Sequence, residues 1–182
     1  MAMAMALQPG CTGKARTPDE AYRRFVAAVR SADGGALFDA VDPATRWAWM
    51  TVQKWHREAY DIVLSNYPEG PARDRELRRF QAGATATSGR ELFRAEMTAT
   101  LPTLAPLAAP GASIVVDPAG DSAAAVLPGG KALLRRGENG AWGYAGLAAL
   151  ADEQKNRAYH DLEMVRASAA DYERAAARAA AR

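Results

Sequence analysis

Two side chains in one segment of the sequence could carry out proton chemistry. His56 and Tyr60 stand four residues apart, and residues at that spacing lie on one face of a helix. A histidine titrates near neutral pH and can act as a general base, while a tyrosine hydroxyl can donate a hydrogen bond to a substrate oxygen. Asp61 points about 140° away around the helix, so the spacing predicts no His–Asp pair. The default interpretation of this pattern is a histidine held in a core, and the alternative is a pocket enzyme of the isomerase or hydratase type.

Aromatic side chains accompany this pair and allow the same two interpretations. Trp49 precedes His56 by two turns on one stripe, and Trp142 lies in a later β-favouring run. A large side chain contributes on the order of 2–3 kcal/mol when buried, which makes a core role the default. The alternative is a pocket for a small apolar ligand lined by Trp49, His56, Tyr60 and Trp142. An exposed member, for which we expect Trp47, would mark a partner site.

The only cysteine of the chain is Cys11, in the stretch LQPGCTGK. Leu7 four residues before it, Gly10 directly before it and the polar residues after it resemble the cleavage site of bacterial lipoproteins. That resemblance implies a lipidated Cys11, a periplasmic domain anchored to the outer membrane, and membrane contact through the lipid alone. Several acyl chains anchor a protein stably, whereas one anchors it only marginally. The alternative is a free thiol in a cytoplasmic protein.

Composition narrows the function classes. The 182 residues include 23 basic and 21 acidic ones, a net charge of +2 that predicts no nucleic-acid partner. One cysteine excludes an internal disulfide, and two histidines make a multi-histidine metal centre implausible. Gly129 and Gly130 stand in a turn between β-favouring runs and not before a helix, so no phosphate-binding loop is indicated. We therefore expect neither a metal nor another cofactor.

Helix-start signals divide the chain. Three capping signals are each followed in the sequence by a helical pattern: Thr17-Pro18, Asp42-Pro43 and Ser88. They predict helices from residue 18, from residue 43 to about 67, and from about 89, with a short helix through 37–41 and a charged one over 73–83. Residues 101–110 carry three prolines and are predicted to form a loop.

The pattern changes after Ala112. Short β-favouring runs alternate with turn signals up to Tyr144, and Asn139-Gly140 predicts a two-residue hairpin. We expect about four antiparallel strands and then a long helix from about Leu147. The predicted fold is α+β: an N-terminal helical layer, a small cone-like antiparallel β-meander and a long C-terminal helix. The predicted organisation is a flexible leader over 1–16, an α+β domain over 17–146 and the helix over 147–182.

The C-terminal helix has a heptad-like spacing of apolar residues, and this seam is compatible with two packing partners. It packs on its own domain, or it forms a homodimer with a second copy. The residues of this seam are Ala158, Leu162, Val165, Ala169, Tyr172, Ala176 and Ala179.

The stretch TPDEAYRRFVAAVRSADGGALFDAVDP, residues 17–43, resembles the opening of nuclear transport factor 2-like (SnoaL-like) domains, including small bacterial lipoproteins of that superfamily. The resemblance implies a cone-shaped α+β fold with an apolar pocket between helices and sheet. Two additional helices, a proline-rich segment and the long C-terminal helix depart from that pattern. Such pockets serve enzymes, ligand binders and interaction modules, so the fold would leave the function open.

These observations favour a non-catalytic cell-envelope lipoprotein domain that binds a protein partner or a small apolar ligand. The first alternative is the pocket enzyme that uses His56 and Tyr60. The second is a structural protein that self-associates through its C-terminal helix.

Overall fold

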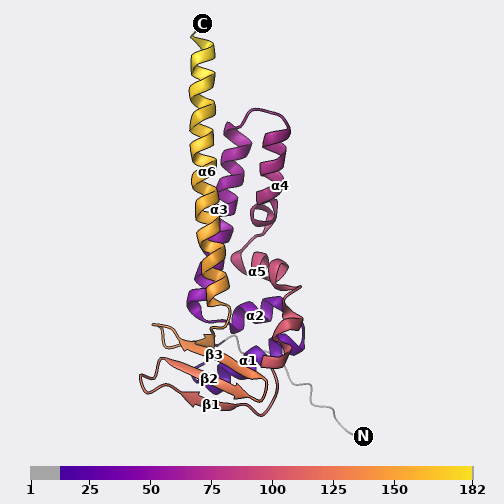
Figure 1. Cartoon of the computed structure of the whole chain (residues 1–182), viewed down its shortest axis with the longest axis vertical. Coiled ribbons are helices and arrows are strands. Elements are labelled where there is room, and N and C mark those ends of the chain that lie inside the picture. The colour runs from indigo at the N-terminus through magenta and orange to yellow at the C-terminus, as the bar shows by residue number, and fades with distance from the viewer. Residues whose placement is uncertain (1–12, 182) are drawn as a thin grey trace.

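The computed structural model describes residues 13–181. Figure 1 shows an elongated molecule, with a mixed body at one end and an arm of helices at the other. The helices are α1 (Pro18–Arg30), α2 (Gly34–Ala40), α3 (Pro43–Asn66), α4 (Pro71–Thr85), α5 (Gly89–Met97), the 3-10 helix η1 (Leu101–Leu107) and α6 (Ala148–Ala180). The strands are β1 (Ser113–Val116), β2 (Ser122–Leu127), β3 (Gly130–Arg136) and β4 (Trp142–Tyr144). The predicted α+β class is confirmed.

The predicted caps begin three of the helices. The Thr17 hydroxyl accepts a hydrogen bond from the Glu20 amide at 3.2 Å, and the Ser88 hydroxyl accepts one from the Glu91 amide at 3.3 Å. The buried Asp42 carboxylate accepts hydrogen bonds from the Ala44 amide at 3.1 Å and from the Thr45 hydroxyl at 2.6 Å. Each cap satisfies amides that the first turn of a helix leaves unpaired.

The sheet is an antiparallel meander in the order β1-β2-β3-β4, as the turn signals predicted. Two details differ from the sequence expectation. The connection between β3 and β4 spans five residues and not two, because the Gly137 amide donates to the Ala141 carbonyl at 2.8 Å and closes a wider turn around Gly140. The segment predicted as a loop contains η1, whose Leu101 and Leu104, three residues apart, are both buried in the core.

The body is built from α1 lying on the sheet. Phe25 of α1 stacks on Tyr144 of β4 with ring centroids 4.0 Å apart, and both side chains are buried. Ala125 of β2 pairs with Ala132 of β3 beneath the helix, and both are fully buried. Alanine at these positions lets α1 approach the sheet closely. Core side chains fill the space between α1 and the sheet.

The outer edge of β4 is covered by the chain segments that flank the helices. The Trp142 amide donates to the Ala15 carbonyl at 2.9 Å, and the Asp42 amide donates to the Tyr144 carbonyl at 3.0 Å. Gly143 lies between these two bonds, and a side chain there would come within 2.5 Å of the Val41–Asp42 backbone. The edge of β4 is therefore closed by backbone contacts.

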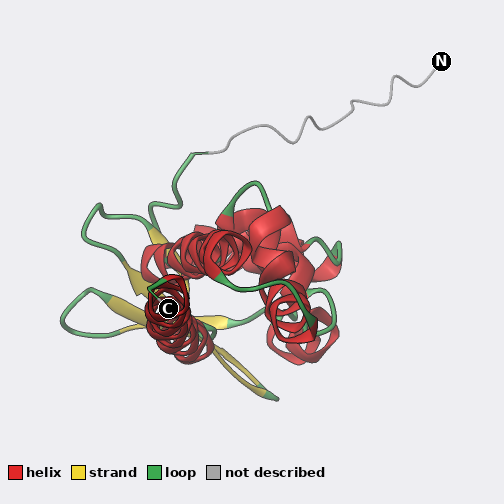
Figure 2. Cartoon of the chain, turned by 90° about the horizontal axis from the view of Figure 1, so that it is seen from above, coloured by secondary structure: helices red, strands yellow, loops and turns green. Residues whose placement is uncertain are grey.

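The arm consists of α4, the distal half of α3 and the antiparallel α6. Its core is a separate cluster of buried side chains: Ala59, Val63, Phe80, Leu162 and Val165. Figure 2, which looks down the arm, shows these helices end-on and the strands spreading out on the side of α6. None of the helices within residues 13–181 has the length and apolarity to cross a bilayer.

The apolar seam of α6 packs largely on the protein's own α3. Ala158, Leu162, Val165 and Ala169 are buried, and Tyr172 packs against Tyr67 with ring centroids 4.9 Å apart. The last two seam positions, Ala176 and Ala179, are exposed, and Figure 1 shows this end of α6 extending beyond α3 and α4. Packing on the parent domain therefore uses most of the seam, while the homodimer stays a prediction.

Candidate functional site

His56 lies half-buried in the arm, where α3 faces α4. Its ring packs against Phe80 with centroids 5.7 Å apart, and its Cβ occupies the space that a side chain at Gly83 would need. Burial lowers the pKa of His56 below its usual value; the nearby Asp161 carboxylate opposes this shift and the Arg79 guanidinium adds to it. The imidazole is therefore held toward its neutral form by its position between helices.

The four residues predicted to share a pocket lie in three different places. Trp49 is buried in the body, edge-on to Phe93 with ring centroids 5.3 Å apart. His56 and Tyr60 belong to the arm, and Trp142 lies in β4. The physical reason is the length of α3: its 24 residues span roughly 36 Å, so one apolar stripe meets two different packing environments. Trp47 is exposed, as expected, with 67% of its surface accessible.

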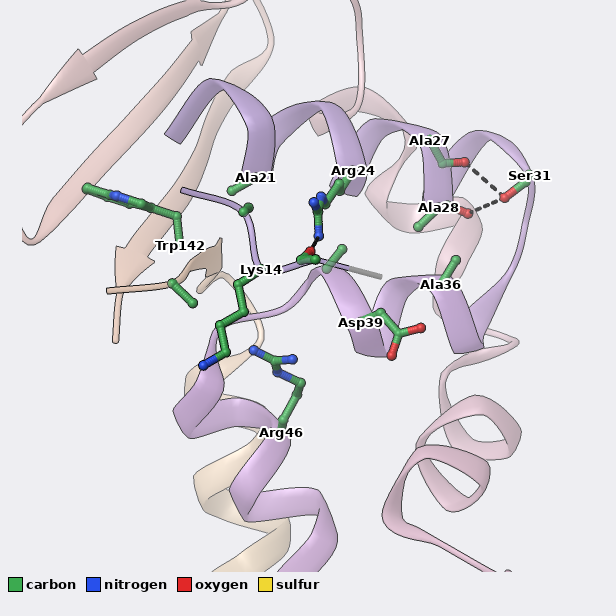
Figure 3. Close-up of a pocket in the computed structure, with 14 residues that line it drawn as sticks. Lys14, Ala21, Arg24, Ala27, Ala28, Ser31, Ala36, Asp39, Arg46 and Trp142 are labelled. Atoms are coloured by element: carbon green, nitrogen blue, oxygen red, sulfur yellow. Dashed lines mark hydrogen bonds between the residues drawn. The ribbon is translucent and has the colours of Figure 1, made fainter. Parts of the chain in front are cut away.

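A cavity of about 640 Å³ lies between α1, α2 and the start of α3. Gly13, Lys14 and Ala15 belong to its lining. Figure 3 shows Lys14 at the cavity, with Trp142 at one end and Asp39 of α2 at the other. Pockets of a few hundred to about 1,000 Å³ hold small organic ligands in proteins. Of the predicted pocket residues, Trp142 alone belongs to this lining.

Half of the residues that line the cavity are alanines. On α1 and α2 the alanines recur at helical spacings, which places them on the facing sides of the two helices. The short side chains leave open volume that larger residues would fill. Alanine is a strong helix former with little surface to bury, so its spacing in the sequence does not distinguish a cavity wall from an ordinary helix face. The apolar lining residues are Ala15, Ala21, Ala27, Ala28, Ala36, Ala40, Ala141 and Trp142.

Charged side chains surround the apolar walls. Arg24 pairs with Glu20 at 2.5 Å and donates to the Gly13 carbonyl, and Asp39 pairs with Arg90 at 3.0 Å. Lys14 and Arg46 complete the charged lining. Neither of them forms an ion pair with another residue of the segment 13–181. With three basic side chains and one carboxylate, the described lining carries a net positive charge.

Within the described residues, the polar side chains of the cavity lining belong to Lys14, Arg24, Ser31, Asp39 and Arg46. Within the described residues it contains no histidine and no carboxylate pair, and its one hydroxyl, Ser31, donates to the Ala27 carbonyl at 2.9 Å. Among residues 13–181 no group of three or more histidine, cysteine and acidic side chains is placed to hold a metal ion. A second hollow, of about 450 Å³, runs along α3 and is lined by residues of that helix alone, from Lys54 to Asn66.

Comparisons with protein-family models, with curated proteins and with solved structures found no match to this chain. The resemblance of residues 17–43 to nuclear transport factor 2-like domains therefore stays a prediction. Cys11, the predicted lipidation site, lies outside the described residues.

Proposed function

We propose that this chain is a non-catalytic binding domain of the bacterial cell envelope, tethered through a lipidated Cys11, whose α1–α2 cavity takes up a small apolar ligand. The observation that carries the proposal is the cavity itself: about 640 Å³, with alanines and Trp142 along its walls. Such a lining favours shape-based uptake of an aliphatic or aromatic molecule, since burial of apolar surface supplies the free energy of binding.

The position of the cavity is consistent with the proposed tether. Gly13 is one of its lining residues and stands two positions after Cys11 in the sequence. Two residues span at most about 7 Å, so an anchor on Cys11 would hold the cavity near the bilayer surface. The arm extends from the other end of the molecule, away from the N-terminal side (Figure 1). A domain held in this way could receive ligands directly from the membrane.

The tether is tested by whole-protein mass spectrometry on the product of the native gene in its own host. We expect a chain that begins at Cys11 and carries added acyl chains. An unmodified cysteine in the mature product would remove the envelope location, while leaving the ligand-binding part of the proposal to be judged separately.

Ligand binding is tested with Nile red, a neutral apolar dye whose fluorescence rises when it leaves water. Ala27 is exposed at the rim of the cavity, so Ala27→Trp should fold normally and occupy part of the volume. Ala95→Trp adds the same side chain at an exposed position of α5 outside the lining. We expect the wild type and Ala95→Trp to bind the dye and Ala27→Trp to bind it much more weakly. Equal binding by all three would contradict a ligand site in this cavity.

The enzyme alternative receives no support from this arrangement. His56 and Tyr60 line neither the α1–α2 cavity nor the hollow along α3, and His56 packs against α4. Self-association keeps one observation in its favour, the exposed end of α6 beyond Glu173.

A further inference from the structure

Two positive charges at the α1–α2 cavity have no negative partner among residues 13–181. Figure 3 shows the side chains of Lys14 and Arg46 extending toward the same, α3, side of the cavity. Both belong to its lining, and within residues 13–181 neither forms an ion pair. Like charges placed close together repel each other, so an anion bound between them would lower the electrostatic energy of this part of the protein.

The other charged residues around the cavity are already neutralised. The Arg24 guanidinium contacts Glu20 and the Gly13 carbonyl. Asp39, the carboxylate of the lining, pairs with Arg90 from α5. The unbalanced charge is therefore positive and is confined to the Lys14–Arg46 end, while the alanine walls of α1 and α2 extend from there toward Asp39 (Figure 3).

We infer that the ligand of this cavity is an anionic amphiphile: one acidic head group, a carboxylate or a phosphate, on an aliphatic chain. The head group lies between Lys14 and Arg46, and the chain lies along Ala28, Ala36 and Ala40. Carboxylates and phosphates form charge-assisted hydrogen bonds with lysine and arginine. The apolar walls match a chain of methylene groups better than a polar nucleotide or sugar, which would leave buried polar atoms unpaired. This inference rests on the proposed ligand-binding function and specifies its ligand class.

The test compares probes that share one chain and differ in the head group. Decanoate, decyl phosphate and decan-1-ol are titrated by calorimetry into the full-length protein and into the double variant Lys14→Gln/Arg46→Gln. The control, Lys131→Gln/Arg135→Gln, removes two positive charges from exposed positions of β3 outside the cavity lining. We expect the wild type and the control to bind the two acids roughly tenfold more tightly than the alcohol.

In the double variant that preference should disappear. Its affinity for the acids should fall about tenfold, to that for the alcohol, while its affinity for the alcohol stays unchanged. Added salt should weaken binding of the acids to the wild type and leave binding of the alcohol unaffected, because exposed charges are screened. Comparison of decanoate with decyl phosphate identifies which head group the two cations prefer.

The outcomes separate this inference from the function on which it rests. If acids and alcohol bind the wild type equally, and the double variant changes neither, the cavity is a general apolar site and the anionic class is wrong. If none of the three probes binds, the proposed ligand-binding function fails together with the inference. A loss of decanoate binding in the β3 control as well would assign the effect to net charge and overturn the head-group site.

Discussion

The body and the arm of this molecule differ in the kind of contact that holds their elements together. In the body, backbone meets backbone: Gly143 of β4 lies against the chain at Val41 and Asp42, and Gly89 of α5 lies against the backbone of Met50. Neither glycine has room for a side chain, since an added Cβ would come within 2.5 Å of main-chain atoms. The elements of the body are therefore fixed relative to one another by groups that have no alternative rotamers.

In the arm, contacts between elements run through side chains. Arg79 of α4 reaches the largely buried Asp161 of α6, and Arg166 of α6 reaches Glu58 of α3 at 2.5 Å. At the tip, the Asn66 amide donates to the Glu173 carboxylate at 2.7 Å. The exposed pair of Arg166 with Glu58 is worth about 1 kcal/mol or less, so this region depends on its small apolar cluster and on keeping the buried Asp161 carboxylate paired. The cavity lies between elements of the body, where close backbone contacts leave little room for movement and would lower the ordering cost of the proposed binding.

The largest effect is expected from a single methyl group in the body. In Gly143→Ala the new Cβ meets the Val41–Asp42 backbone, which cannot move away by changing a rotamer. Overpacking of this kind costs about 3 kcal/mol, which for a chain of this size lowers the melting temperature by roughly 10 °C. Urea titration and thermal unfolding followed by circular dichroism measure both quantities.

The matched control is Gly129→Ala, in the turn between β2 and β3. No atom lies within 4 Å of a Cβ built at Gly129, so we expect a change of less than about 0.5 kcal/mol. If Gly143→Ala were tolerated as well as the control, the body would be more compliant than its close backbone contacts imply, and the contrast with the arm would be lost.

The capping residues predicted where helices begin, because a cap bonds only to the first turn of the helix that follows it. Thr17, Asp42 and Ser88 cap helices wherever they precede a helical pattern, so their positions could be read without knowledge of the fold. The turn after β3 was predicted in place but not in length. The bond between the Gly137 amide and the Ala141 carbonyl, which widens that turn, has no counterpart in dipeptide preferences.

The candidate site could not be predicted in the same way. His56 and Trp49 share a stripe on α3, yet they contact different regions because no sequence pattern states where along a long helix the neighbouring elements end. The cavity exists because large side chains do not fill it. Ala28 and Ala36 leave open volume only where no larger side chain from another element extends into the same space, and the sequence does not state this. Lys14 lies in a segment with no periodic pattern, and the bond between Ala15 and Trp142 holds that segment at the cavity that Arg46 also lines.

A smaller effect, confined to the arm, is expected from acidification. Burial lowers the pKa of His56 in the folded protein, and Asp161 and Arg79 are the charged groups that act on it there. The unfolded chain then binds a proton more readily than the folded one, so the contribution of His56 to stability is complete above about pH 6.5 and is lost as the pH falls toward the lowered folded value. Urea titrations between pH 7.5 and 5 measure this slope.

Two variants assign that slope to its residue. His56→Gln should flatten the pH dependence over this interval, whereas His160→Gln, which changes an exposed histidine of α6, should keep it. An unchanged slope in His56→Gln would place the proton-sensitive group elsewhere. Gly143→Ala should shift stability equally at every pH, which separates the two regions in one set of experiments.

The smallest effect is expected from removal of residues 174–182, the end of α6. Contacts with α3 end at Tyr172 and Glu173, and the described residues beyond them are exposed. The free energy of unfolding should therefore change by less than about 0.5 kcal/mol. A chain ended after Arg166 loses the buried Ala169 and the contact of Tyr172 with Tyr67, and should lose about 1–2 kcal/mol. Light scattering on the full chain and on both shortened chains tests self-association. If removal of residues 174–182 halves the molar mass, the exposed end of α6 forms a dimer contact. If the molar mass per chain stays the same, the end forms no such contact.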